Sequence, residues 1–212
     1  MRKLFLTSSV NFTAKHLTQY LGFNPKGKKL LFIDTAAEGE PSDDKQWLVD
    51  DHQALVDIGF KVSDYTLTGK TQEEIKKTLN EAEVIFVSGG NTFYLLEKIQ
   101  LSKSAKLFAE EIAKGKVYIG SSAGSVIAGP DISLVKRLDI ENRAPNLKGY
   151  QGLGLVDFTV LPHWGSDYFR ELYLNKRLED VYGMKHKLIL LTDNQYVYVE
   201  GETYRILDRE KD

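Results

Sequence analysis

Short apolar runs alternate with amphipathic segments along most of this chain, and this alternation restricts its fold more than any other feature. We expect strands at residues 3–7, 29–35, 60–65, 82–88, 116–119, 158–161 and 188–191. Most of these runs are rich in β-branched residues and do not alternate apolar with polar side chains. That pattern is typical of parallel strands whose two faces are both covered.

Helix-like segments separate the expected strands. They lie at residues 43–57, 71–80, 91–99, 102–114 and 167–182. This order of strands and helices predicts βαβ units and a mainly parallel sheet with helices on both faces. The tail differs, because residues 195–200 and 203–207 flank Gly201-Glu202 and predict an antiparallel hairpin. We therefore expect one α/β domain that covers residues 1–212.

The composition limits the classes of function. The chain has 212 residues and a formal net charge of −2, so it carries no strong attraction for nucleic acid or anionic membranes. No apolar run approaches the length of a membrane span. Cysteine is absent, which excludes disulfides, thiolate metal sites and a cysteine nucleophile, and which fits a reducing cytosol. We expect a soluble cytoplasmic protein, and the sequence leaves its oligomeric state open, a homo-oligomer included.

The stretch Gly120-Ser121-Ser122-Ala123-Gly124 follows an expected strand and fits the pattern G-x-S-x-G, with Ser122 at its centre. In a nucleophile elbow the serine takes a strained backbone conformation between a strand and a helix, so its neighbours must be very small. A helix-like stretch follows here, and the N–H of Ala123 is a candidate oxyanion donor. The alternative is a βα turn without chemistry. We expect Ser121 to be a polar residue in the wall of the site.

A second turn with two glycines ends the expected strand at residues 82–88. Gly89 and Gly90 allow backbone N–H groups to approach a ligand closely. Ligands of open α/β sheets bind at the carboxyl ends of strands, so this turn and Ser122 are expected to face the same crevice. An N–H of Gly89 or Gly90 would then be a second oxyanion donor. A plain tight turn is one alternative, and a phosphate-binding loop is another, although neither G-x-G-x-x-G nor a Walker lysine is present.

A serine nucleophile needs a base, and the chain has four histidines. His163 directly follows an expected strand and its proline, which places it at the same edge of the sheet as Ser122. His16 and His52 fall in amphipathic segments, and His186 lies between two lysines. Those three positions are typical of surface or boundary histidines, so His163 is the candidate base.

Two aspartates are candidates for the acid that orients the histidine. Asp193 closes an expected strand and therefore lies at the same edge of the sheet as Ser122 and His163. Asp139 lies in a long irregular segment between that serine and that histidine. The position at the edge favours Asp193, and Asp139 remains open.

The acidic pairs Asp43-Asp44 and Asp50-Asp51 are not typical of metal sites. Adjacent residues on a helix do not face one another, and no two histidines have the spacing of metal ligands. We interpret these carboxylates as parts of solvated helix faces. We expect no metal and no cofactor.

Three segments in this order, IFVSGGNTFYLL, KVYIGSSAGSVIAGP and VLPHW, resemble the peptidase E family of serine peptidases. The resemblance extends from the first strand to the final hairpin. It implies a fold similar to class I glutamine amidotransferases, a flavodoxin-like three-layer sandwich, with Ser122 as nucleophile and His163 as base. Asp193 matches a late acidic position of the family directly, with Asp in place of Glu. Asp139 matches an earlier position only if a short insertion is allowed.

The resemblance also implies small peptides as substrates. Aspartyl dipeptidases of this family prefer peptides with an N-terminal aspartate, which should require a cationic group in the pocket. Arg170, Lys176 and Arg177 are available, but the stretch after His163 is shorter than in that subgroup, so strict Asp-X specificity does not follow.

The sequence therefore predicts a serine peptidase that needs no cofactor and uses an acyl-enzyme. The alternative is a non-catalytic module that binds an anion or small molecule through the same glycine-containing turns. A glutamine amidotransferase is excluded, because that chemistry needs a cysteine at the elbow and the chain has none.

Overall fold

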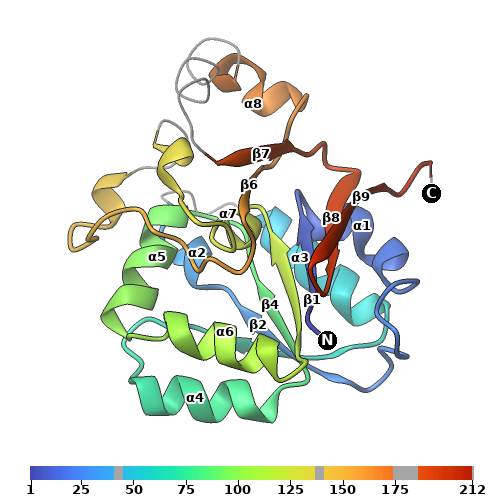
Figure 1. Ribbon diagram of the computed structural model, residues 1–212, viewed down its shortest axis with the longest axis horizontal. Helices are drawn as coiled ribbons and strands as arrows, with labels where there is room; N and C mark the ends of the chain where they lie inside the picture. Colours follow the sequence, from blue (N-terminus) through green and yellow to red (C-terminus); the bar gives the residue numbers. More distant parts are fainter. Residues whose placement is uncertain (41–44, 137–140, 174–185, 212) are drawn as a thin grey trace.

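The computed structural model describes residues 1–40, 45–136, 141–173 and 186–211, and its main sheet has seven strands in the order β3-β2-β4-β5-β1-β8-β9 (Figure 1). These strands are β1 (Lys3–Thr7), β2 (Lys29–Ile33), β3 (Lys61–Tyr65), β4 (Val84–Val87), β5 (Val117–Ser121), β8 (Gln195–Glu200) and β9 (Thr203–Asp208). The first five run parallel to one another. β8 is antiparallel to β1 and forms the predicted hairpin with β9.

Helices connect the parallel strands and cover both faces of the sheet. They are α1 (Val10–Leu17), α2 (Thr35–Glu38), α3 (Gln46–Asp57), α4 (Gln72–Glu81), α5 (Thr92–Leu101), α6 (Ala105–Ala113), α7 (Ala123–Val126) and α8 (Asp167–Leu172). Two 3₁₀ turns, Ser133–Val135 and Glu141–Arg143, lie in the segment that was expected to be irregular. The predicted helix at 167–182 begins as expected, and its part from residue 174 onward lies outside the described residues, as do residues 43 and 44.

The central strands are buried on both faces, as their continuous apolar sequences predict. In β1, Leu4 and Leu6 belong to the hydrophobic core on one face, and Phe5 belongs to the core on the other. Helices α4, α5 and α6 cover the first face, whereas α1 and α3 cover the second (Figure 1). The fold is therefore the expected α/β sandwich with a mainly parallel sheet.

A capping box starts α4 where the sequence predicts it. The Glu74 N–H donates to Oγ1 of Thr71 at 3.2 Å, and the Thr71 N–H donates to the Glu74 carboxylate at 2.8 Å. Two N–H groups that the helix itself leaves unsatisfied are thus paired.

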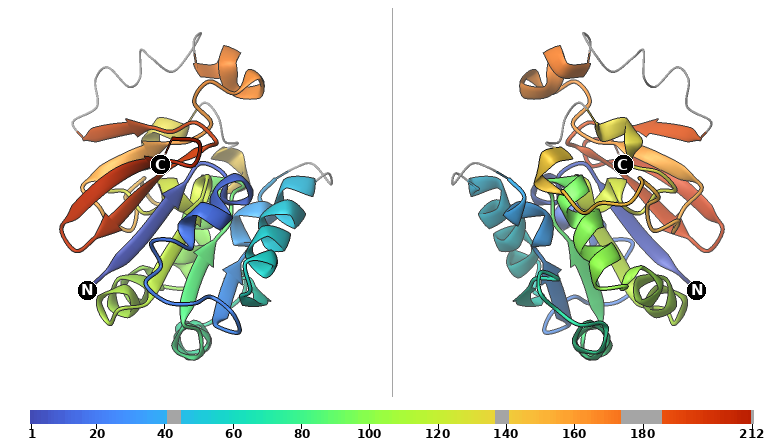
Figure 2. Two further views of the ribbon diagram at one scale, coloured as in Figure 1. Left: turned by 90° about the vertical axis from the view of Figure 1, so that its right-hand side faces the viewer. Right: turned by 90° about the vertical axis from the view of Figure 1, so that its left-hand side faces the viewer.

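The strands β6 (Phe158–Leu161) and β7 (Lys187–Leu190) form a separate parallel pair. They cannot extend the main sheet next to β1, because β8 occupies that edge of β1. Figure 2 shows α8, in orange, beyond the end of the sheet and next to this pair. The strand positions were predicted, but this division into two sheets was not.

Candidate active site

Ser122 occupies the tight turn between β5 and α7. Its backbone has φ 48° and ψ −109°, a combination that residues with a side chain rarely adopt. Packing requires the flanking glycines: a Cβ on Gly120 would lie 2.5 Å from the carbonyl oxygen of Gly124, and a Cβ on Gly124 would collide with the carbonyl of Val87. The chain therefore turns sharply and holds Ser122 at the carboxyl end of β5, with the strain that an elbow requires.

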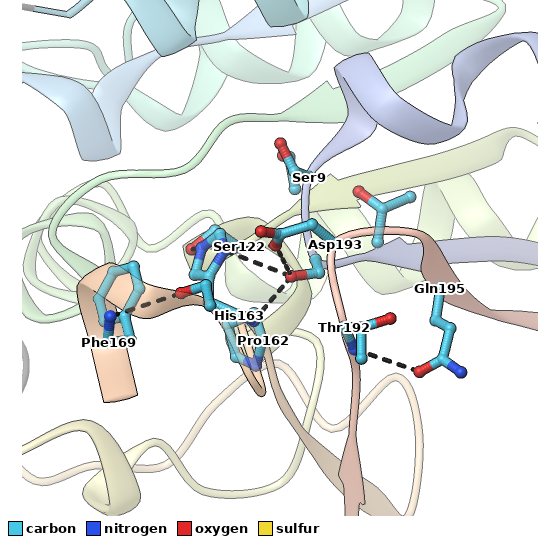
Figure 3. Close-up of polar contacts among 12 residues, drawn as sticks. Ser9, Ser122, Pro162, His163, Phe169, Thr192, Asp193 and Gln195 are labelled. Carbon is cyan, nitrogen blue, oxygen red and sulfur yellow. Dashed lines mark hydrogen bonds and ion pairs between the residues drawn. The ribbon is translucent and has the colours of Figure 1, made fainter. Parts of the chain in front are cut away.

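His163 and Asp193 lie beside Ser122, although the three residues follow three different strands. Nε2 of His163 lies 2.9 Å from Oγ of Ser122, and Nδ1 of His163 lies 2.7 Å from Oδ1 of Asp193 (Figure 3). When the proton is on Nδ1, the ring donates to Asp193 and accepts from the serine hydroxyl. This is the geometry in which an imidazole can take a proton from a serine.

The backbone and the ring of His163 are both held in place. The residue has φ 61°, and its N–H donates to Oγ of Ser8 at 2.7 Å. The ring of Phe169, at the start of α8, stacks on the imidazole at 4.7 Å between centroids and 9° between planes. The imidazole is therefore oriented by its neighbours before any ligand binds.

Ser8, which the sequence analysis did not single out, contacts all three of these residues. Its Oγ donates to Oδ1 of Asp193 at 2.6 Å and accepts from the His163 N–H, and its carbonyl accepts from the N–H of Ser122 at 3.1 Å. Ser8 is fully buried at the carboxyl end of β1. Because Ser8 follows an expected strand, its place at the carboxyl end of that strand is the signal that could have identified it.

The Asp193 carboxylate is stabilised in its ionised form. Burial by itself would favour the protonated acid, but hydrogen bonds from His163 and Ser8 outweigh it and hold the pKa of Asp193 below its usual range. The group is therefore ionised near neutral pH and can stabilise a positive charge on the imidazole.

The turn with two glycines lies directly beside the elbow, as predicted. A Cβ on Gly89 would lie 3.2 Å from Cβ of Ser122, and the N–H of Gly124 donates to the carbonyl of Ser88 at 3.1 Å. Gly90 has φ 123°, and a Cβ there would collide with the backbone of Ala36. The turn therefore requires glycine at position 90, and a side chain at position 89 would crowd Ser122.

Three backbone N–H groups near Ser122 are candidates for binding a negatively charged oxygen. Within the described part of the chain, the N–H groups of Gly89, Gly90 and Ala123 donate to no backbone or side-chain acceptor. The N–H of Ser122 itself is used, because it donates to the carbonyls of Thr7 and Ser8.

Three expectations from the sequence are wrong. Ser121 was expected in the wall of the site, and Asp51 on a solvated helix face. Both are 2% exposed, and the hydroxyl of Ser121 donates to Oδ2 of Asp51 at 2.8 Å on the side of α1 and α3. His16 was expected near the surface, but it is buried and its Nδ1 lies 3.0 Å from the hydroxyl of Tyr196.

Several other predicted residues are exposed, are paired elsewhere or lie outside the described residues. His52 is paired with Asp64 at 3.3 Å, and His186 is exposed. Arg170 is exposed on α8. Residues outside the described part are Asp43, Asp44, Asp139, Lys176 and Arg177.

Neither a metal cluster nor a membrane span is found in the part of the chain that the structure describes. No group of three or more His, Cys, Asp or Glu side chains within residues 1–40, 45–136, 141–173 and 186–211 is arranged to hold a metal ion. No helix formed by these residues is both long and apolar enough to cross a membrane.

Comparison with known proteins identifies relatives over nearly the full length of the chain. "Uncharacterized peptidase Lmo0363" of Listeria monocytogenes is 34% identical over 202 residues, which cover 95% of this chain and 96% of that protein. A Nostoc protein named "Peptidase E" is 30% identical over 170 residues, which cover 77% of this chain and 65% of that protein.

A solved structure and a family model agree with these relatives. The crystal structure of a proposed peptidase E protein from Listeria monocytogenes EGD-e matches with a TM-score of 0.89 and 32% identity, covering 98% of both chains. The model for "Peptidase family S51" matches residues 4–207. The chain therefore belongs to peptidase family S51 and is a serine-type peptidase.

Proposed function

We propose that this peptidase hydrolyses small peptides with Ser122 as nucleophile, His163 as general base and Asp193 as the acid that orients the imidazole. One observation carries the proposal: a continuous chain of hydrogen bonds, 2.9 Å and 2.7 Å long, runs from the strained serine through the imidazole to the carboxylate. A serine hydroxyl is a weak nucleophile by itself, and such a base activates it.

The reaction takes two stages. In the first, Oγ of Ser122 attacks the carbonyl carbon of the scissile bond while Nε2 of His163 takes the hydroxyl proton. The C–N bond then breaks, and His163 gives this proton to the leaving amine, which leaves an ester on Ser122. In the second stage, water attacks the ester as His163 takes its proton. The ester C–O bond breaks, and the proton returns to Ser122. Asp193 remains ionised throughout and stabilises the imidazolium.

The tetrahedral intermediate places a negative charge on the former carbonyl oxygen. The N–H group of Ala123 would donate to this oxygen together with the N–H group of Gly90 or Gly89, because both turns lie beside Ser122. One such donor contributes about 2.7–4 kcal/mol to the stability of the transition state.

Two aromatic side chains restrict the space around the nucleophile. The indole of Trp47, on α3, lies 3.4 Å from where a Cβ on Gly89 would be. The ring of Phe169 covers one face of the His163 imidazole. The two rings, one beside Gly89 and one on His163, leave less room for a large substrate and so favour short peptides over folded proteins. A preference for an N-terminal aspartate is not part of this proposal.

The test combines labelling with hydrolysis. The protein is treated with a fluorophosphonate, the labelled residue is identified by peptide mapping, and hydrolysis is measured against a panel of dipeptides. We expect the label on Ser122 and loss of both labelling and hydrolysis in Ser122→Ala. The matched control is Ser63→Ala, which changes an exposed serine on β3 at the far edge of the sheet. Full hydrolysis by Ser122→Ala would overturn the assignment.

A second function, binding of an anion without catalysis, is supported by the N–H groups of Gly89, Gly90 and Ala123, which donate to no acceptor in the described part of the chain. It predicts no labelling of Ser122 and tight binding of small carboxylates. The labelling experiment therefore separates the two functions directly.

A further inference from the structure

Asp51 is a buried carboxylate directly behind the elbow, and the proposed reaction does not use it. It lies in the middle of α3 and is 2% exposed. The hydroxyl of Ser121 donates to its Oδ2 at 2.8 Å, and the N–H of Asn11 donates to its Oδ1 at 3.1 Å. The N–H of Val10 donates in turn to Oγ of Ser121 at 3.2 Å. Burying a carboxylate costs free energy, so a buried carboxylate that accepts hydrogen bonds from two different segments calls for a reason.

These contacts join α3 to two segments that carry the site. Ser121 is the residue before Ser122, and α1 begins two residues after Ser8. The N-cap of α1, Ser9, makes no capping hydrogen bond with its side chain. The first two N–H groups of α1 are satisfied instead by Ser121 and Asp51. Asp51 therefore anchors both the elbow and the start of the segment that follows Ser8.

The network fits the ionised form of Asp51 better than the protonated form. Both carboxylate oxygens accept hydrogen bonds in the structure. If Oδ2 carried a proton, it would have to donate to Ser121, whose own hydroxyl proton would then lose its acceptor. Protonation of Asp51 therefore disrupts the contact next to Ser122.

The environment places this protonation close to neutral pH. Burial raises the pKa of Asp51 to about 7, although the hydrogen bonds from Ser121 and Asn11 and the attraction of His163 act in the opposite direction. Asp50, on the same helix, raises it further. The groups that α1 and β5 direct at the carboxylate are the uncharged Asn11 N–H and the Ser121 hydroxyl.

We propose that Asp51 is a positioning residue whose ionised carboxylate holds Ser121 and the start of α1, and thereby keeps Ser122 and Ser8 in place for His163. Asp51 touches no reacting atom, and it acts through Ser121 and through the start of α1. The inference rests on the proposed role of Ser122 as nucleophile. Its consequence is that the reactivity of Ser122 depends on two ionisations: His163 must be neutral, and Asp51 must be charged.

The test measures the second-order rate of fluorophosphonate labelling at Ser122 between pH 5 and 9. For the unmodified protein we expect the labelling rate to fall with decreasing pH, along the acid limb of the profile, more steeply than a single ionisation would give. In Asp51→Asn the limb should have the slope of one ionisation, and the highest rate should fall roughly 10- to 100-fold, as for loss of a hydrogen bond to a charged group. Asp57→Asn, an exposed aspartate on the same helix that bonds Gln53, is the matched control and should retain the original profile.

A second variant keeps the test decisive if Asp51→Asn does not fold. Ser121→Ala retains the carboxylate and removes one donor, which should raise the pKa of Asp51 and move the steep part of the acid limb to higher pH. Thermal unfolding establishes that each variant is folded. If the folded variants keep the original profile, Asp51 has only a structural role and the inference is overturned. If Ser122 of the unmodified protein is not labelled at all, the proposed function fails as well.

Discussion

Oγ of Ser8 lies 2.6 Å from Oδ1 of Asp193 and 2.7 Å from the backbone nitrogen of His163. His163 and Asp193 follow the separate pair β6–β7, whereas Ser122 follows β5 of the main sheet. Ser8, at the end of β1, therefore connects the two sheets at the point where the three side chains meet. The Ser8 hydroxyl therefore holds Asp193 and His163 relative to each other, and the Ser8 carbonyl holds the backbone of Ser122.

Replacing Ser8 by alanine should lower kcat/KM for a dipeptide roughly 10- to 100-fold. The variant loses the donor to ionised Asp193 and leaves the His163 N–H without its acceptor, and a hydrogen bond to a charged group contributes about 1.5–3 kcal/mol. The matched control is Ser9→Ala, because the Ser9 hydroxyl donates to the Asn11 side chain at 2.7 Å and to none of the three site residues. Equal activity of the two variants would contradict a positioning role for Ser8.

The two candidate acids can be separated by amide substitution. Asp193→Asn should reduce kcat roughly 10⁴-fold, because the amide can donate to Nδ1 of His163 and stabilise the wrong tautomer. Asp139→Asn should leave kcat close to that of the unmodified protein. Steady-state hydrolysis and circular dichroism of both variants provide the measurement. A larger loss in Asp139→Asn than in Asp193→Asn would show that the acid is misassigned.

Much of this arrangement was predictable because parallel strands end at the same edge of a sheet. The strand β5 ends directly before Ser122, and the strands β6 and β7, although they form a separate parallel pair, are followed by His163 and Asp193 beside that end. The strained turn at Ser122 was predicted from the very small residues beside it. The formation of two sheets was not predictable, because apolar runs indicate strands but not which strands pair.

The error at Asp51 has a specific cause. The pair Asp50-Asp51 was interpreted from its charge, although Asp51 is four residues from both Trp47 and Leu55 and so lies on the apolar face of α3. Only the fold reveals that this face meets the start of α1 and Ser121. Ser8 was missed for a similar reason, since a serine after a strand matches no motif until its partners are known.

Gly90→Ala should destabilise the protein and abolish labelling of Ser122. Its φ of 123° is unfavourable for alanine, and the added Cβ would collide with the backbone of Ala36. Gly115→Ala is the matched control, because Gly115 has φ 101° and open space where its Cβ would be. Urea unfolding should show a loss of about 1 kcal/mol for the control and a clearly larger loss for Gly90→Ala. Similar losses in both variants would mean that the collision is relieved by movement of α2.

Asp34, at the end of β2, links stability to pH. Its Oδ1 is buried, without a hydrogen-bond partner in the described part of the chain. Burial, followed by repulsion from Glu38, raises the pKa of Asp34 to about 6. An aspartate in an unfolded chain ionises near pH 3.9. Between about pH 4 and 6 the folded protein therefore holds a proton that the unfolded chain has lost, and the contribution of Asp34 to stability falls as the pH rises through this range.

Asp34→Asn removes this ionisation. The free energy of unfolding of the variant, minus that of the unmodified protein, should therefore increase as the pH rises. Urea unfolding at pH 4.5, 6.0 and 7.5 measures the difference between the two proteins at each pH. Asp57→Asn, at an exposed position on α3, controls for loss of one negative charge and should show a difference that changes little with pH. A pH-independent difference for Asp34→Asn would mean that Asp34 ionises in the folded protein as it does in the unfolded chain. A growing difference shows instead that a buried charge is retained at this edge of the sheet at the expense of stability.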